Sequence, residues 1–303
     1  MKNNTLVAGA GGVLGTHLLY ELSARGLSAR LFTRDMKSLQ HRFHSHAHQF
    51  ATGGDAPALS EWEIKEGDAL RPATLENLCS GIDVVISSIG SSLRLNNWRD
   101  KRSFQDVDYS GNKNLLKEAQ KSGVRKFVYV SSFMGETMNT AYTNAHESFV
   151  QELKNSGLEY VVVRPTGFFY VNLEFLAMAR NGFASLVGNG RAKTNPIHEQ
   201  DVACACLDAA FRLRNEEMSV GGPEIFTRQE IVELAFATLA KKPRIAHAPA
   251  ITTAIASRCI TPFNRRIGEL VEFLGYVSVH DCIAPLYGKQ RLAEYFTEAA
   301  KKL

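Results

Sequence analysis

The 303-residue chain has few cysteines, no long apolar run and no strong excess of either charge. Its five cysteines are odd in number and form no Cys-x-x-Cys pair, which argues against a disulfide scaffold and a zinc site. No stretch reaches about 18 uninterrupted apolar residues, so we expect no membrane-spanning helix. Lysine and arginine outnumber aspartate and glutamate by 35 to 31, an excess too small to indicate a nucleic-acid partner.

The composition is that of a globular protein, with 45% hydrophobic and 22% charged residues and a mean hydropathy of -0.16. A chain of this length can bury a large core. An apolar run begins at Thr5, which leaves no room ahead of it for a targeting peptide. Together with the unpaired cysteines, this predicts a cytoplasmic protein.

Short runs rich in valine and isoleucine alternate with amphipathic helical stretches along the first half of the chain. This alternation is typical of a parallel sheet covered by helices on both faces, because each strand is then buried on both sides. The sequence therefore predicts an α/β fold of the Rossmann type with a doubly wound parallel sheet. The expected strands span residues 5–9, 29–33, 63–66, 84–89, 126–131 and 160–164.

Beyond residue 167 the alternation loosens and helical patterns dominate. Thr227 and Glu230 have the spacing of a capping box that opens a helix. We expect residues 1–167 to form the Rossmann core and residues 168–303 to add a smaller, mainly helical part within one integrated domain. That part is expected to form the substrate pocket and its lid. Its helices are expected near residues 171–179, 199–212, 231–240, 251–273 with a break at Pro262, and 290–301.

Four histidines lie within residues 41–48. Their spacing can present imidazoles to a metal ion, but no acidic or cysteine ligand lies close by. A solvated surface segment is the alternative interpretation, and we expect no metal site in the protein.

The sharpest local signal is a glycine-rich segment that ends the first expected strand and opens the first expected helix. Glycines there permit a tight turn and a close approach of the backbone to a pyrophosphate. The helix N-terminus adds unpaired N–H groups and a positive dipole end. The segment therefore predicts a dinucleotide-binding loop, with contacts from Gly9, Gly11, Gly12, Val13, Leu14 and Gly15.

The second expected strand ends in Thr33 and Arg34, where NAD-selective sites usually carry an acidic residue. A guanidinium can pair instead with a 2′-phosphate, so we expect NADP(H) to be preferred, with NAD(H) still possible. A solvated Arg34 is the plain alternative. Asp68 could contact the adenine or simply begin a turn, and Ser88 and Ile89 end the fourth strand near the expected path of the cofactor.

Further segments that match a known pattern are Gly67-Asp68, Val107 to Asn112, Lys126 to Ser132, Arg164 to Phe169, Asn195 to Ala203 and Ala284 to Gly288. With the glycine pattern and Arg34, they cover nearly the whole chain. The chain resembles the atypical short-chain dehydrogenases/reductases of the NmrA-like, NAD(P)H-binding kind. The resemblance implies that the sixth strand ends beside the nicotinamide, at Pro165, Thr166, Gly167 and Phe168.

Short-chain dehydrogenases typically use a Tyr-x-x-x-Lys pair and a serine, and the lysine lowers the pKa of the tyrosine. The resemblance places Tyr142 at the tyrosine position and His146 at the lysine position, on one helix face. A histidine with a reference pKa of about 6.5 carries little charge at neutral pH, so activation of Tyr142 is weakened. Tyr142 is expected to donate a proton or merely to line the pocket, and His146 to contact the cofactor. Ser131 could orient a substrate carbonyl and Ser132 could contact the cofactor, or both could cap the strand end.

Two functions fit these residues. The first is an NADP(H)-dependent oxidoreductase that reduces a carbonyl, enone or quinone-like small molecule. The second is a non-catalytic NADP(H)-binding protein that senses redox state or assists a partner. The histidine at the lysine position favours the second, and the glycine-rich loop fits both. We expect a monomer or homodimer with a small-molecule substrate, no nucleic acid and no stable membrane insertion.

Overall fold

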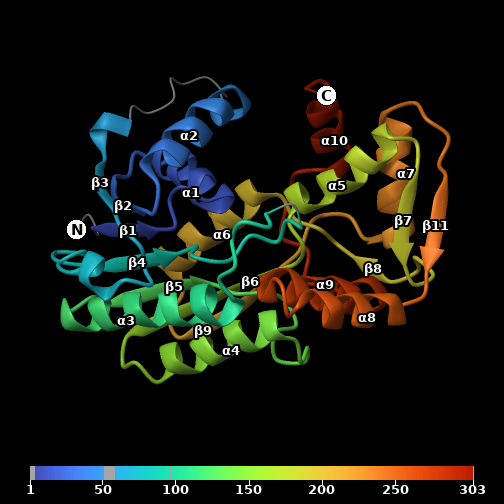
Figure 1. The fold of residues 1–303 in the computed structure, drawn as a ribbon. Helices are drawn as coiled ribbons and strands as arrows, with labels where there is room; N and C mark the ends of the chain where they lie inside the picture. Colours follow the sequence, from blue (N-terminus) through green and yellow to red (C-terminus); the bar gives the residue numbers. More distant parts are fainter. Residues whose placement is uncertain (1–3, 51–58, 96, 303) are drawn as a thin grey trace.

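The aliphatic runs of the first half form a seven-stranded parallel sheet in the computed structural model, which describes residues 4–50, 59–95 and 97–302 (Figure 1). The strand order β3-β2-β1-β4-β5-β6-β9 reverses direction beside β1, as in a doubly wound sheet. Every pairing in this sheet is parallel, so the carboxyl ends of the strands share one edge. The strands are β1 (Thr5–Ala8), β2 (Ala29–Thr33), β3 (Glu63–Glu66), β4 (Val84–Ser87), β5 (Lys126–Val130), β6 (Glu159–Pro165) and β9 (Glu216–Val220).

Helices cover both faces of the sheet because successive strand residues point to opposite sides (Figure 1). In β1, Val7 packs with one layer, whereas Leu6 and Ala8 pack with the other. The first layer holds α1 (Val13–Ala24), α2 (Met36–Phe50) and α6 (Glu199–Arg212). The second holds the short 3-10 helix η2 (Pro72–Leu75), α3 (Asn112–Lys121) and α4 (Ala141–Lys154), with the π-helical turn η3 (Gln105–Gly111) leading into α3.

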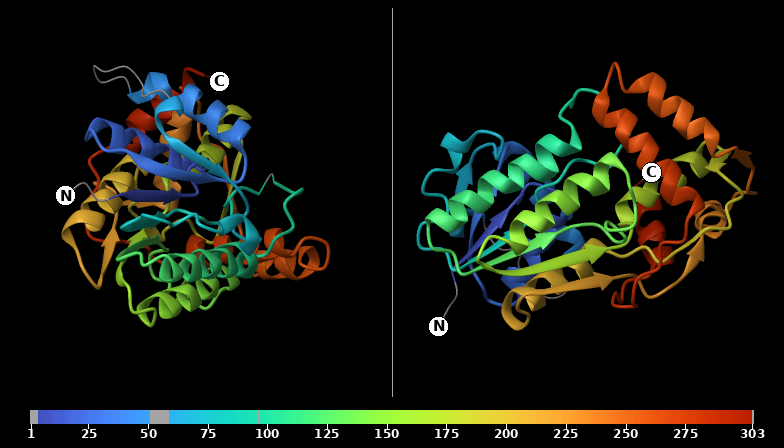
Figure 2. Two further views of the ribbon diagram at one scale, coloured as in Figure 1. Left: turned by 90° about the vertical axis from the view of Figure 1, so that its left-hand side faces the viewer. Right: turned by 90° about the horizontal axis from the view of Figure 1, so that it is seen from below.

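The C-terminal part is mainly helical, as predicted, and packs beside the carboxyl edge of the sheet (Figure 2). One cluster joins α5 (Phe169–Arg180), α7 (Arg228–Thr238) and α10 (Leu292–Ala300) around the paired strands β7 (Ala184–Val187) and β11 (Ile245–Ala248). The strands β8 (Lys193–Thr194) and β10 (Phe226–Thr227) form a second small pair. The helices α8 (Ile251–Ile260) and α9 (Arg265–Val279) form a hairpin whose second helix contacts α4.

Several local signals proved correct. The capping box of Thr227 and Glu230 opens α7. The break expected at Pro262 separates α8 from α9, and Asn264 caps α9 by accepting a hydrogen bond from the Ile267 amide. The histidine-rich segment continues α2, but the side chains of residues 45–50 lie outside the described residues.

The chain returns to the sheet after the expected division at residue 167. α6 packs against α1, and β9 pairs with β6 to complete the sheet. The alternating pattern does not reveal β9 because three of its five residues, Glu216, Glu217 and Ser219, are polar and it forms an edge strand. The division at residue 167 stays a prediction as a boundary between folding units, but the sheet itself draws on both parts.

Candidate functional site

The carboxyl edge of the sheet opens into a cleft of about 460 Å³. Its floor is the glycine-rich loop between β1 and α1. Its walls come from the segments after β2, β4 and β5, from α4, and from the start of α5. A crevice at the point where strand order reverses is where open α/β sheets bind ligands.

Tight backbone packing explains why the loop needs glycine. Gly9 has a φ of +88°, and its amide and that of Ala10 both donate to the Phe32 carbonyl at 3.0 Å. A Cβ on Gly11 would lie 2.6 Å from Thr33 Oγ1, and one on Gly15 would lie 2.2 Å from the Gly9 carbonyl oxygen. The loop therefore keeps its shape only with glycine at these positions.

The first turn of α1 faces the cleft with its N–H groups uncapped. Its N-cap is Gly12, which has no side chain to accept a hydrogen bond, and the turn contains no acidic residue. Val13 and Leu14 line the cleft at this point. Unpaired amides and a positive helix dipole make this floor suitable for a phosphate group.

The β2 side of the cleft is rich in charge. Arg34 lines it, exposed, and makes no ion pair within the described part of the chain. Thr33 is buried at the strand end, and Asp68 lies beside Arg102, whose guanidinium pairs chiefly with Asp100 at 2.5 Å. An exposed cation that makes no ion pair with the described residues therefore follows β2, on the side of the sheet where this fold class holds the adenosine ribose.

On the other side of the cleft, α4 begins at Ala141. Thr140 caps it reciprocally with Thr143, so Tyr142 and His146 both lie on its first two turns and line the cleft together. Their rings meet edge to face with centroids 4.6 Å apart. The spacing expectation for these two residues is met, while their chemical roles stay predictions.

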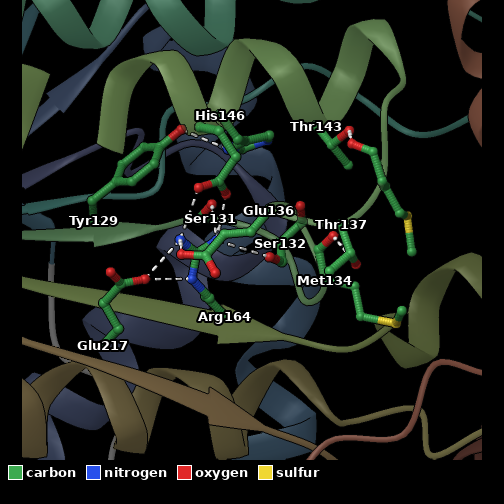
Figure 3. A network of polar contacts seen from close by, with 12 residues as sticks. Tyr129, Ser131, Ser132, Met134, Glu136, Thr137, Thr143, His146, Arg164 and Glu217 are labelled. Carbon is green, nitrogen blue, oxygen red and sulfur yellow. Dashed lines mark hydrogen bonds and ion pairs between the residues drawn. The ribbon is translucent and has the colours of Figure 1, made fainter. Parts of the chain in front are cut away.

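His146 lies between two buried groups, Tyr129 and Asp108, and Figure 3 shows its contact with Tyr129. Its Nδ1 is 2.6 Å from the hydroxyl of Tyr129. Its Nε2 lies 3.3 Å from Oδ1 of Asp108 but has no hydrogen-bond partner. Asp108 is itself fixed by the Ser91 amide at 3.1 Å. Among the described residues, this buried ring nitrogen therefore faces a carboxylate without forming a hydrogen bond.

Tyr142 stands in an aromatic cage rather than beside a cation. Phe104 meets its ring at 5.0 Å and Phe273 of α9 at 4.5 Å between centroids. Burial, followed by the charge of Asp108, raises the pKa of the Tyr142 phenol well above its ordinary value. The phenol is therefore neutral at physiological pH.

Ser131 and Ser132 follow β5 and contact a buried ionic network (Figure 3). Burial by itself lowers the pKa of the Arg164 guanidinium, but its bonds to Glu147 of α4 and Glu217 of β9 raise that pKa above its ordinary value. Its Nη1 donates to Ser131 Oγ at 3.4 Å, which leaves the serine hydroxyl hydrogen free to point elsewhere. Ser131 lines the cleft.

Most predicted site residues line the cleft, and a few do not. Gly15 packs beneath the loop against Gly9, and the Ser132 hydroxyl is buried without a partner away from the cleft wall. Thr166 turns its hydroxyl to the Asn195 carbonyl at 2.6 Å, so the strand end ties into the C-terminal part. The predicted residues outside the lining are Gly15, Ser132, Pro165, Thr166 and Gly167, and those within it are Gly9, Gly11, Gly12, Val13, Leu14, Thr33, Arg34, Asp68, Ser88, Ile89, Ser131, Tyr142, His146 and Phe168.

Sequence reasoning missed several lining residues because they lie on loops or outside the expected motif positions. Arg42, on α2, donates from Nε to the Gly11 carbonyl at 3.1 Å. Arg94, Asn97, Asp100 and Arg102 come from the loop after β4. The one sequence signal for Arg42 is the amphipathic pattern of α2, in which Leu39 and Phe43 are buried and so define which face of the helix is turned to the protein.

Comparison with known proteins agrees with this geometry. A family model described as NAD(P)H-binding matches residues 9–212. The chloroplastic divinyl chlorophyllide a 8-vinyl-reductase of Arabidopsis thaliana is 26% identical over 329 residues, which cover 99% of this chain and 77% of that protein. The photosystem II assembly factor Ycf39 of Trieres chinensis is 24% identical over 284 residues, covering 91% of this chain and 82% of that protein.

Among solved structures, the NADPH-dependent quinone oxidoreductase QOR2 of Escherichia coli, in complex with NADPH, superposes with a TM-score of 0.72. The two share 16% sequence identity, and the match covers 98% of this chain and 99% of the other. This similarity confirms the Rossmann-type fold. In the described part of the chain, no helix is both long and apolar enough to cross a membrane.

Proposed function

The chain belongs to the NAD(P)H-binding family, and from this we propose that it is an NADPH-dependent reductase of a carbonyl, enone or quinone-like small molecule. One observation carries the proposal. A single cleft joins the glycine-rich loop to a wall where Tyr142, Ser131 and the unpartnered Nε2 of His146 stand together. A dinucleotide on the loop would present its nicotinamide toward that wall.

The residues present fit such a cofactor. The uncapped first turn of α1 would hold the diphosphate with its backbone amides. Gly9 and Gly11 would allow the loop its shape, because a Cβ atom at either position would clash with neighbouring residues. Arg34 would pair with the 2′-phosphate, which is the reason we propose NADPH over NADH. The orphaned Nε2 of His146 would bond a ribose hydroxyl. When bound, the nicotinamide supplies or accepts a hydride.

The state of Tyr142 favours reduction over oxidation. A neutral phenol can donate a hydrogen bond or a proton to an acceptor oxygen that gains negative charge. The reverse reaction needs a phenolate base, and burial raises the pKa of Tyr142 against that form. Ser131 would donate its hydroxyl hydrogen to the same acceptor oxygen, because the Ser131 oxygen already accepts a hydrogen bond from Arg164.

His146 would act as a positioning residue. The Tyr129 hydroxyl holds its ring at Nδ1, while Nε2 faces Asp108 at 3.3 Å without a hydrogen bond. In this proposal it holds the cofactor ribose in place of the usual lysine but does not lower the pKa of Tyr142. Acceptors whose reduced anions are weakly basic, such as quinones, need the least help from a proton donor and are therefore the first to try.

The cofactor assignment is tested by calorimetric titration of nucleotide-free protein with NADPH and then NADH. Arg34→Ala should weaken NADPH binding about tenfold or more and leave NADH binding unchanged. Arg214→Ala is the matched control, because Arg214 is 71% exposed and lies outside the cleft. Equal loss for both nucleotides would contradict a 2′-phosphate contact, and absence of binding would overturn the family-based assignment.

The reductase assignment is tested by loss of NADPH absorbance with a panel of quinones, enones and aldehydes. Tyr142→Phe should lower the turnover of carbonyl acceptors while leaving the NADPH affinity unchanged. If the rate is the same, Tyr142 is not the proton donor. His146→Lys should raise the rate of turnover only if the lack of a cation next to Tyr142 limits that rate.

A second function is supported by a specific observation. Among the described residues no cation shifts the pKa of Tyr142, and burial keeps its phenol neutral, which also suits a protein that binds NADP(H) without turnover. One relative is named as an assembly factor rather than an enzyme. Tight NADPH binding with no turnover on the whole panel would favour this function. A cytoplasmic location, a monomer or homodimer, and the absence of a nucleic-acid partner remain parts of the proposal.

A further inference from the structure

The phenol of Tyr129 on β5 is fully buried, and its hydroxyl meets the cleft-lining His146 (Figure 3). Within the described part of the chain, this hydroxyl makes a single hydrogen bond, of 2.6 Å to Nδ1 of His146. Burial, and then the charge of Asp108, raises the pKa of the Tyr129 phenol well above its ordinary value, so the hydroxyl keeps its hydrogen. That buried hydrogen needs an acceptor, and Nδ1 is the partner that the fold provides.

The direction of this bond decides where the histidine ring carries its own hydrogen. A neutral imidazole has one N–H group and one nitrogen with a lone pair. If Nδ1 accepts the phenol hydrogen of Tyr129, the N–H group of a neutral His146 is at Nε2. In the opposite arrangement Nδ1 would donate, and the phenol hydrogen would be buried without an acceptor, which is unfavourable.

The other nitrogen of the ring gives an independent indication of the same arrangement. Nε2 lies 3.3 Å from Oδ1 of Asp108, whose side chain is buried and accepts from the Ser91 amide at 3.1 Å. The oxygens of an ionised carboxylate only accept hydrogen bonds. A lone pair on Nε2 would therefore be repelled by Asp108, whereas an N–H group there is attracted even though the contact is not a hydrogen bond.

We propose that Tyr129 is a positioning residue that holds His146 as the neutral tautomer with its hydrogen on Nε2. His146 then acts as a hydrogen-bond donor toward Asp108 and toward any ligand atom that reaches Nε2. An ammonium group is also a donor only, so this tautomer gives the histidine the hydrogen-bonding role of the lysine in a Tyr-x-x-x-Lys pair without its charge. The tautomer is independent of the proposed function, and its consequence for NADPH binding rests on that function.

The tautomer is measured by nitrogen-15 NMR of the imidazole rings in nucleotide-free protein at a pH of about 8, above the reference histidine pKa of about 6.5. The chain has nine histidines, and His146→Gln identifies the signals of His146 by their loss. We expect Nε2 of His146 to have the chemical shift of an N–H nitrogen and Nδ1 that of a nitrogen with a lone pair. An N–H group at Nδ1, alone or together with one at Nε2, would overturn the proposal.

Tyr129→Phe tests whether the phenol is the donor to Nδ1. The Nδ1 signal of His146 should move to that of a nitrogen without a donor, and an unchanged signal would refute the role of Tyr129. Tyr20→Phe is the matched control, because the Tyr20 phenol is also buried and donates at 2.6 Å, to the Phe43 carbonyl. It should leave the His146 signals as they are. If Tyr129→Phe does not fold, the spectrum of the unaltered protein still decides the tautomer.

Calorimetric titration then measures the consequence for the cofactor. Tyr129→Phe should weaken NADPH binding about two- to tenfold, and Tyr20→Phe should not. A moved Nδ1 signal with unchanged NADPH affinity would refute the positioning role. Absence of NADPH binding in the unaltered protein would refute the proposed function, while the NMR spectrum would still confirm or overturn the tautomer.

Discussion

Replacing Arg266 by methionine should remove the hydrogen bonds that hold the loop after β4 to α9, while keeping most of the volume of the side-chain stem. The variant loses four donated bonds to carbonyl oxygens, of which those at 2.5 and 2.6 Å are the strongest. A hydrogen bond from a charged donor contributes about 1.5–3 kcal/mol, and the freed carbonyls can recover water if the loop moves. We therefore expect a loss of about 3–4 kcal/mol in unfolding free energy.

For a chain of this size that loss corresponds to a fall of roughly 5–6 °C in the melting temperature, measured by circular dichroism. Arg258→Met, on the exposed surface of α8, is the control and should melt with the wild type. A local readout comes from limited trypsin digestion, because Arg99 and Lys101 lie in the loop. Cleavage there should accelerate in Arg266→Met. Wild-type melting together with wild-type cleavage would refute the anchoring role.

Three other changes follow from the same geometry. Gly15→Ala places a Cβ 2.2 Å from the Gly9 carbonyl, so NADPH affinity should fall at least about tenfold by calorimetry, and unchanged affinity would contradict the close packing of the loop. Burial raises the pKa of Glu199 from 4.5 to about 7, so its contribution to stability is full below about pH 4.5 and is lost as pH rises through 7. Glu199→Gln should therefore remove up to about 3 kcal/mol of the fall in unfolding free energy between pH 4.5 and 8, and an unchanged pH profile by denaturant titration would argue against a buried acid. Asp108→Asn removes a charge that raises the phenol pKa of Tyr142, so the alkaline limb of turnover should move to lower pH, and a limb that stays in place would exclude Tyr142 as its source.

Local patterns were enough to predict the fold class and one half of the site. Alternating aliphatic runs report burial on both sides of a strand, and they marked six of the seven strands of the main sheet. The edge strand β9 (Glu216–Val220) was not predicted, because an edge strand is less covered and needs fewer apolar residues. The glycine spacing predicted the loop because its glycines meet local backbone requirements, such as the φ of +88° at Gly9.

The other half of the site depends on residues that are distant in sequence. Asp108 and Tyr129 meet His146 only because η3, β5 and α4 converge at the carboxyl edge. Thr166, by contrast, follows a strand as expected but turns away, since the Asn195 carbonyl captures its hydroxyl.

The sequence by itself determined the Rossmann-type sheet, the glycine-rich loop and the pairing of Tyr142 with His146 on one helix face. These features rest on periodicity and on glycine conformation, which act over a few residues. Tertiary structure alone decided the raised pKa of Tyr142, the partners of His146 and the arrival of Arg42 and Arg94 in the cleft. Burial and electrostatic coupling arise only when separate elements pack together, and no local spacing encodes them.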